Sequence, residues 1–359
     1  MAPKTFLIVF GAISVSGCMV GPDFQTPETK LQPAFSQPQK TAFTEALPSA
    51  LETAPNPVHW WAGFNDPTLT DLLARAAKDN LSLQRAAIRI YQARSQLGVA
   101  DASLLPTVGL GGGVTRNDQP NALTQFLNAS SLSTTQNLVV QANWEIDFWG
   151  KYRRGIESTV SSLFSTTAAY YAADVSLAAD VANTYITIRN VQALIKVART
   201  NLALQAESLR IASSRFKNGA TSLLDLSQAQ SQYEQTKSEI PALISSLKNA
   251  EYAMSILLGE VPDFYEKTYG NTTGHLQPPR SLQVGIPKDL LRRRPDVLQA
   301  EYAAAAQSAL IGVNTAALYP SFSLSGYFGF QNVSINNLNQ SSLFSWDNRT
   351  TSIGGSFVF

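Results

Sequence analysis

Two stretches of sequence decide the fold: "ASLLPTVGLGGGVTRN" at residues 102–117 and "AALYPSFSLSGYFGFQ" at residues 316–331. Each runs from a small-residue segment of helical character, through a proline, into a Gly-rich segment. In that last segment, apolar or small residues fall on alternate positions, as a strand with one apolar face requires. In the first stretch these positions are Val108, Leu110, Gly112 and Val114. The chain therefore predicts the same helix–proline–strand unit twice.

The two stretches align without gaps when Pro106 is placed on Pro320, 214 residues later. The matched pairs include Gly98/Gly312, Val99/Val313, Ala102/Ala316, Leu104/Leu318, Leu110/Leu324 and Gly112/Gly326. We expect a helix over 68–104 and return strands at about 138–148 and, by the same offset, 352–362. The repeat predicts a complete first unit and the opening of a second, whose remainder would need roughly another hundred residues beyond Phe359.

A long helical segment separates the two units. Residues 156–218 contain neither Gly nor Pro, and an unbroken helix of this length would measure about 95 Å. Its apolar residues follow a near-heptad spacing, which predicts helices wound along one another. We expect Asn218–Gly219 to end this helix and Ser222 to begin a returning helix to about Leu258, interrupted or kinked at Pro241.

The composition excludes several classes of function. Lys and Arg total 27 against 26 Asp and Glu, so net charge does not favour a nucleic-acid partner. The chain has one cysteine and two histidines, which excludes an intrachain disulfide, a thiolate zinc site and a Cys/His nucleophile. No carboxylate pair or histidine arrangement supports an enzyme, and no cofactor is expected.

The N-terminal residues have the pattern of an export signal. Residues 1–17 combine Lys4, an apolar run and the small pair Ser16–Gly17, and they are too short to span a bilayer. The cut site is similar to a bacterial lipoprotein box, in which Cys18 becomes the first residue and carries diacylglycerol and an N-acyl chain. An ordinary signal peptide with an incidental cysteine is the alternative. The residue after this cysteine is Met19 and not the aspartate that commonly retains lipoproteins in the inner membrane. The outer membrane is therefore the expected destination.

The domain organisation follows from these segments. After the signal peptide we expect a Pro-rich extended segment over 18–57, a first repeat over 58–262, a linker over 263–288 and an incomplete second repeat over 289–359. Asp66 followed by Pro67 predicts a helix start. Trp60, Trp61 and Phe64 are expected to pin the extended segment to the helices.

The strand count predicts an oligomer. Alternating strands in an outer-membrane protein belong to a closed barrel, because lipid tolerates no unpaired strand edge. Two hairpins supply four strands, and the smallest membrane barrels need about eight. Several copies must therefore pool their strands and bundle their long helices into a hollow cylinder. The fold class is mainly α, with long coiled helices and a four-strand contribution to a shared β-barrel.

The sequence also resembles the TolC-type outer-membrane efflux factors, in the lipoprotein branch that includes the NodT and OprM groups. The similar motifs are "GCMVGPDFQTPE" at 17–28, "NWEIDFWGK" at 143–151, "RFKNGATSLLDL" at 215–226 and "IPKDLLRRRPDVLQAE" at 286–301, with the Trp-Trp-containing start of the first helix at 60–69. The resemblance implies a homotrimer with a twelve-stranded barrel and a long α-barrel. It also implies a channel that joins a periplasmic adaptor protein and an inner-membrane pump to export drugs or other small solutes.

The turn between the long helices is the candidate partner site, because the resemblance implies that such tips meet the adaptor. Its residues are Arg215, Gly219, Ala220, Ser222, Leu224 and Asp225. Simple turn chemistry is the alternative for each of them. For the whole chain the alternative function is a non-conducting outer-membrane lipoprotein, or a non-functional remnant of such a channel.

Overall fold

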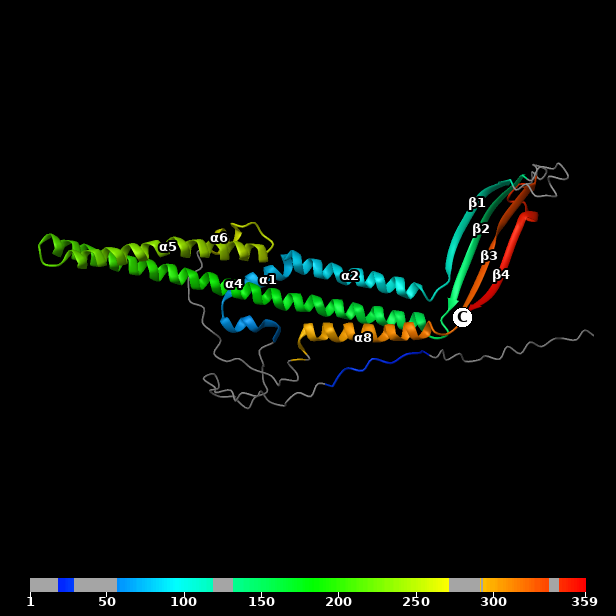
Figure 1. Ribbon diagram of the computed structural model, residues 1–359, viewed down its shortest axis with the longest axis horizontal. Coiled ribbons are helices and arrows are strands. Elements are labelled where there is room, and N and C mark those ends of the chain that lie inside the picture. The colour runs from blue at the N-terminus through cyan, green and yellow to red at the C-terminus, as the bar shows by residue number, and fades with distance from the viewer. Residues whose placement is uncertain (1–18, 29–56, 119–131, 271–290, 292, 336–341) are drawn as a thin grey trace, which may run out of the picture. The chain divides into compact units, whose positions relative to one another are not determined.

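The structure is a computed structural model that describes residues 19–28, 57–118, 132–270, 291, 293–335 and 342–359 (Figure 1). It divides into two compact units. The first comprises Met1–Glu28, Tyr91–Thr166 and Gln299–Phe359, and the second comprises Thr29–Ile90 and Thr167–Leu298. Cys18, the predicted lipidation site, and the predicted signal peptide lie outside the described residues.

The first unit holds a four-stranded antiparallel sheet in the order β1-β2-β3-β4 (Figure 1). Its strands are β1 (Thr107–Asp118), β2 (Leu132–Ile146), β3 (Ser321–Ile335) and β4 (Arg349–Val358), with the short 3-10 helix η2 (Trp346–Asn348) before β4. Helix α2 (Leu81–Ala102) leads into β1, α4 (Lys151–Lys217) follows β2, and α8 (Pro295–Ala316) leads into β3. Each hairpin pairs with its neighbour through β2 and β3, so the two repeats share one sheet.

The register places apolar residues of all four strands in common rows. Val108 is opposite Ala142, Ala142 is opposite Gly326, and Gly326 is opposite Ile353. The next row of this face contains Leu110, Val140 and Phe328. Residues one position along each strand point to the other face, and there they are mostly Gly, Ser, Thr, Asn and Gln. The sheet therefore has one apolar and one polar face.

The 214-residue repeat is confirmed by the element bounds. Helices α2 and α8 begin at Leu81 and Pro295 and end at Ala102 and Ala316, so both ends differ by 214 positions. Strand β3 begins the same distance after β1. The first return strand begins at Leu132, earlier than expected, because the polar residues 132–137 pair with 113–118.

The second unit contains the described hydrophobic core. Its elements are η1 (Pro57–Phe64), α1 (Pro67–Asp79), the start of α2, the part of α4 from Thr167 onward, α5 (Leu223–Leu257) and α6 (Phe264–Tyr269). The core residues come from five helices: Leu69, Leu72, Leu73, Ala76, Leu83, Leu177, Val181, Ala182, Tyr185, Ile188, Met254, Leu258 and Tyr265. Trp61 and Phe64 pack against this cluster.

Asp66 begins α1 as predicted. Its Oδ1 accepts the backbone N–H groups of Thr68 and Leu69, and Pro67 occupies the first turn. Its second oxygen, Oδ2, accepts the hydroxyl of the buried Tyr185 at 2.8 Å. Burial, followed by this bond to Asp66, raises the pKa of Tyr185 to about 12. One carboxylate therefore caps α1 and ties its start to α4.

The expectation of one continuous helix over 68–104 is wrong. Asn80 separates α1 from α2 with an extended backbone. Its Oδ1 accepts the N–H groups of Ser82 and Leu83, which starts α2, and its amide Nδ2 donates to the carbonyl of Leu257 at 2.9 Å. The asparagine thus turns the chain and fastens the turn to the end of α5.

Three other expectations are adjusted by the structure. The long helix begins at Lys151 and contains Gly155, so it is longer than the Gly-free run indicated. Pro241 lies inside α5 and does not interrupt it. The segment predicted as a linker over 263–288 begins with helix α6, and residues 271–288 lie outside the described residues.

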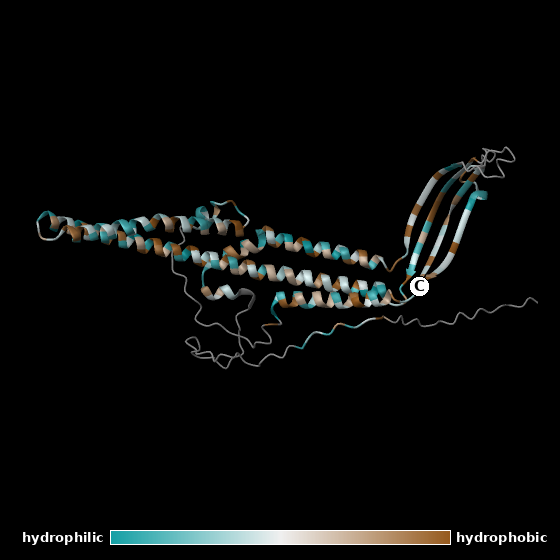
Figure 2. Cartoon of the chain, in the orientation of Figure 1, coloured by the Kyte–Doolittle hydropathy of each residue, from teal (hydrophilic) through white to brown (hydrophobic). Residues whose placement is uncertain are grey.

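The long helices carry mixed surfaces. Figure 2 shows hydrophilic and hydrophobic residues interspersed along α4 and α5. Among the helices that the structure describes, none is long and apolar enough to cross a membrane.

Candidate functional site: the helix tip and the strand–helix junction

The predicted tip is a closed turn between α4 and α5. The Ala220 N–H donates to the carbonyl of Arg215 at 2.9 Å, and the Gly219 N–H donates to the carbonyl of Phe216 at 3.0 Å. Gly219 has a φ of +70°. This pair of bonds around a left-handed glycine is the Schellman arrangement that satisfies the last carbonyls of a helix. Gly219 therefore ends α4 as predicted.

The other side of the turn is a capping box. The Ser222 hydroxyl accepts the Asp225 N–H, and the Asp225 carboxylate accepts the Ser222 N–H, both at 3.2 Å. The carboxylate also accepts the Thr221 hydroxyl. Hydrogen bonds from Thr221 and Ser222 lower the pKa of Asp225 below its usual value. Ser222 and Asp225 thus have a structural role in starting α5.

The tip still offers a contact surface. Leu223 and Leu224 are 63% and 65% exposed, and Phe216 is 39% exposed. A Cβ added at Gly219 would meet no atom within 4 Å. Of the six predicted residues, Ala220 and Leu224 lie on the exposed apolar surface. Leu223 and Phe216 lie there too, and sequence reasoning missed them.

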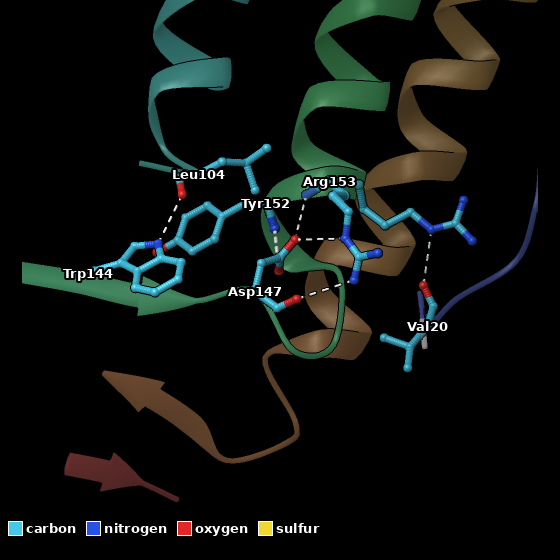
Figure 3. Close-up of polar contacts among 7 residues, drawn as sticks. Val20, Leu104, Trp144, Asp147, Tyr152 and Arg153 are labelled. Carbon is cyan, nitrogen blue, oxygen red and sulfur yellow. Dashed lines mark hydrogen bonds and ion pairs between the residues drawn. The ribbon is translucent and has the colours of Figure 1, made fainter. Parts of the chain in front are cut away.

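The second candidate region joins the sheet to the helices in the first unit. Asp147, between β2 and α4, accepts the N–H groups of Tyr152 and Arg153 at 3.1 and 3.0 Å (Figure 3). The Arg153 guanidinium donates to the Asp147 carboxylate at 3.2 Å and to its backbone carbonyl at 3.2 Å. The carboxylate is 9% exposed. It caps the first turn of α4 directly at the end of β2, which makes the turn rigid.

Two tryptophans, Trp144 near the end of β2 and Trp149 in the turn before α4, hold the two turns that lead into strands. The Trp144 indole N–H donates to the carbonyl of Leu104, between α2 and β1 (Figure 3). The Trp149 indole N–H donates to the carbonyl of Pro320, between α8 and β3, and both bonds measure 2.9 Å. Trp149 also stacks on Tyr319, with ring centroids 4.7 Å apart. The motif "NWEIDFWGK" is therefore a junction that fixes the start of β1, β3 and α4.

A cavity of about 480 Å³ lies beside this junction, lined in part by Glu145, Lys151 and Tyr319. Two of its charged residues are paired with each other: Lys151 Nζ lies 3.1 Å from Glu145 Oε1. The Tyr152 hydroxyl donates to Glu145 Oε2 at 2.9 Å, and Asp147, which also lines the cavity, is paired with Arg153. Burial and the bond to Glu145 raise the pKa of Tyr152 to about 12. These groups stabilise the junction and leave little free charge for a ligand.

Metal-ligating side chains do not gather in the described part of the chain. Over residues 19–28, 57–118, 132–270, 291, 293–335 and 342–359, no group of three or more His, Cys, Asp or Glu could hold a metal ion.

Comparisons with known proteins agree with this architecture. The chain matches the family described as outer membrane efflux protein over residues 72–260. It belongs to the outer membrane efflux protein family. This is a family of efflux proteins and not of enzymes, and its fold of long helices with a four-stranded antiparallel sheet is the one found here.

Individual relatives extend the match over most of the chain. Nodulation protein T of Rhizobium leguminosarum bv. trifolii is 31% identical over 88% of this chain. The chain spans 65% of that relative's length. The probable outer membrane lipoprotein SilC of Salmonella typhimurium is 28% identical over 96% of this chain and 70% of its own length. The solved outer-membrane channel OprN superimposes with a TM-score of 0.80 at 30% identity, covering 95% of this chain and 73% of that chain.

Proposed function

We propose that this protein is the outer-membrane channel component of a tripartite efflux system that exports drugs or other small solutes. In this proposal three copies pool their four strands into one barrel and their long helices into one hollow cylinder. A periplasmic adaptor and an inner-membrane pump complete the pathway. The exported compound is selected by the pump, because a wide tube discriminates little.

The apolar face of the sheet carries this proposal. Val108, Leu110 and Val114 on β1 are 71–72% exposed, and Ile353 and Phe357 on β4 are 82% and 73% exposed. In water such a surface would be unfavourable by about 25 cal/mol per Å² of apolar area. In a bilayer it would face lipid, and the polar face would line an aqueous lumen.

The sheet edges point to the same assembly. Strands β1 and β4 are the two ends of the order β1-β2-β3-β4, so each has one side without a described strand partner. Because the strands alternate in direction, β4 of one copy would pair antiparallel with β1 of the next. Such pairing closes the edges that a bilayer cannot tolerate.

Three finer assignments belong to the proposal. Cys18 would carry diacylglycerol and an N-acyl chain, a proposal supported by the name of the lipoprotein relative SilC. The two-repeat organisation would begin at about residue 58, with the second repeat from about 289. The tip residues Arg215, Gly219, Ala220, Ser222, Leu224 and Asp225 would form the adaptor contact, through the exposed leucines that their turn presents.

Electrophoresis of outer-membrane fractions tests the assembly. We expect an unheated sample to migrate at three times the monomer mass and a boiled sample at the monomer mass. A monomer in both lanes, with the protein present in the outer-membrane fraction, would contradict the shared barrel. It would support the alternative of a non-conducting lipoprotein.

A matched pair of variants tests the tip. Ala220→Trp places a large ring on an exposed residue of the turn whose φ is not positive, and Ala220→Asn places a small side chain at the same position. If the tip contacts the adaptor, the tryptophan variant loses export while keeping membrane insertion, and the asparagine variant keeps both. Equal export by both variants and the parent would refute the assignment.

A further inference from the structure

The segment that follows Cys18 lies against the helices of the first unit (Figure 1, blue). The Val20 N–H donates to the carbonyl of Trp149 at 3.2 Å. The Thr26 hydroxyl donates to Glu301 on α8 at 2.7 Å. The motif "GPDF" at 21–24, which the proposed channel function does not explain, lies between these two contacts.

The spacing of the contacts shows that this segment is extended along α8. Gly21 touches Gly312, and Thr26 bonds Glu301. The helix rises about 16 Å between Glu301 and Gly312, and five residues of chain reach at most about 18 Å. The segment therefore runs antiparallel to α8 after a bend at Gly21, whose φ is +95°. Pro22 favours this conformation, since its φ is restricted to extended and turn values.

Arg154 on α4 is the residue that holds the segment. Its side chain is only 2% exposed. Nε donates to the Val20 carbonyl at 3.1 Å, and Nη2 donates to the Gly21 carbonyl at 3.1 Å and to Asp23 Oδ1 at 2.7 Å. Nη1 donates to Glu157 Oε2 at 2.7 Å. Three of these four acceptors belong to the N-terminal segment, so most of the protein partners of the guanidinium lie there.

Two glycines make room for this arrangement. Gly21 has a φ of +95°, and a Cβ there would lie 2.4 Å from the Cα of Gly312. A Cβ at Gly312 would lie 2.8 Å from Cγ of Arg154. The backbone of the segment, the arginine side chain and the backbone of α8 are therefore in direct contact.

The Arg154 guanidinium is charged, and its hydrogen bonds offset the cost of burying that charge. Burial disfavours the charged guanidinium, but hydrogen bonds with Asp23 and Glu157 outweigh this effect and raise the pKa of Arg154 above its usual value. Departure of the segment would remove three acceptors from the guanidinium and leave water to replace them.

We propose that Arg154 is a latch that recognises residues 20–23 and fastens the N-terminal segment between α4 and α8. The latch makes the start of the mature chain a fixed part of the strand–helix junction and joins elements of the two repeats. This recognition does not depend on the channel function. Its consequence, that a lipid on Cys18 is fixed in position relative to the sheet, rests on the proposed lipidation.

Hydrogen–deuterium exchange of the purified full chain in detergent tests the latch. The readout is the exchange rate of peptides covering 19–24, in which the Val20 amide is protected by Trp149. In Arg154→Met we expect this rate to rise at least about tenfold, because the segment opens locally. Arg154→Lys should give a similar rise, since one ammonium cannot reach acceptors in the fork geometry of arginine.

Two further variants distinguish loss of the Arg154 contacts to residues 20–23 from a general loss of stability. Glu157→Gln neutralises the one partner of Arg154 that lies on α4 and not in the N-terminal segment. This variant should change the exchange rate of residues 19–24 less than about twofold. The Asp23 carboxylate is 84% exposed, so its substitution should not disturb packing. Asp23→Asn should raise the exchange rate about threefold or more. An unchanged rate in a folded Arg154→Met protein would overturn the proposal. If that variant does not fold, an unchanged rate in Asp23→Asn would overturn it.

The exchange experiment is distinguishable from tests of the proposed function. Failure to form a trimer appears on the gel, and absence of lipid appears in the mass of the N-terminal peptide. Neither result alters the comparison of exchange rates between the parent protein and its Arg154 and Asp23 variants.

Discussion

Gly98 and Gly312 occupy the same position in the two repeats, and their surroundings differ. A Cβ added at Gly98 on α2 would meet no atom within 4 Å. A Cβ added at Gly312 on α8 would meet three atoms of the Arg154 side chain within 2.9 Å. The same residue is therefore required by close packing in one repeat of the chain and is free of contacts in the other. Sequence identity between repeats does not imply identical roles.

The largest effect is expected from replacing these two glycines by alanine. Gly312→Ala should lower the free energy of unfolding by about 1–3 kcal/mol, because the added methyl group displaces Arg154. Gly98→Ala should raise it by about 0.5–1 kcal/mol, because alanine is favoured over glycine inside a helix. Thermal unfolding of the purified protein in detergent compares the two variants with the parent. Equal effects of the two substitutions would contradict the asymmetry.

The next effect concerns the junction between β2 and α4. Asp147→Ala removes the carboxylate that accepts two N–H groups of α4 and the Arg153 side chain. We expect a loss of about 1–2 kcal/mol, as for other N-terminal caps. The matched control is Asp296→Ala on α8, whose carboxylate is 53% exposed and should cost less. A loss for Asp147→Ala no larger than that for the control would contradict the role of the buried cap.

The two tryptophan contacts should also differ. Trp149→Phe removes a bond to Pro320 and changes the stack on Tyr319, and we expect a loss of about 1–1.5 kcal/mol. Trp144→Phe removes only the corresponding bond to Leu104, at a more exposed position, and should cost about 0.5–1 kcal/mol. Chemical denaturation compares the two variants. The opposite order would contradict the tighter packing of the second repeat.

The smallest effect is local to the tip of the second unit. Ser222→Ala breaks the capping box and should cost at most about 1 kcal/mol at this exposed turn. The change should appear as faster amide exchange at the start of α5 without a change in the core helices. Faster exchange of α1 in the same variant would show that the tip is coupled to the core, contrary to our expectation.

The sequence predicted those elements whose signals are local. The alternation in β1, the repeat offset, the N-cap at Asp66 and the glycine turn at Gly219 all follow from neighbouring residues and are confirmed. Arg154 could not be found in this way, because it stands beside Arg153 in "KYRRG" and only tertiary contacts distinguish the buried arginine from its neighbour. Asn80 was missed for the same reason: its amide bonds a carbonyl 177 residues away.

The candidate site was predicted in part. The tip turn is formed by the residues that the sequence indicated, but Ser222 and Asp225 use their polar groups within the turn. The exposed apolar residues Leu223 and Phe216 gave no sequence signal, since apolar residues next to a helix end are more often buried. Exposure is a property of the fold and could not be derived from residue type.

Cysteine cross-linking between copies tests the shared sheet most directly. Two differently tagged copies would be expressed together, one with Ser352→Cys on β4 and the other with single cysteines placed in turn along β1, from Thr107 to Asp118. We expect mild oxidation to join the two copies by a disulfide in the outer membrane at one register of β1, because a disulfide forms only between directly adjacent strands. Gln141→Cys on the inner strand β2 should give no such product. Absence of cross-links along the whole of β1, with both copies in the outer membrane, would contradict the shared barrel.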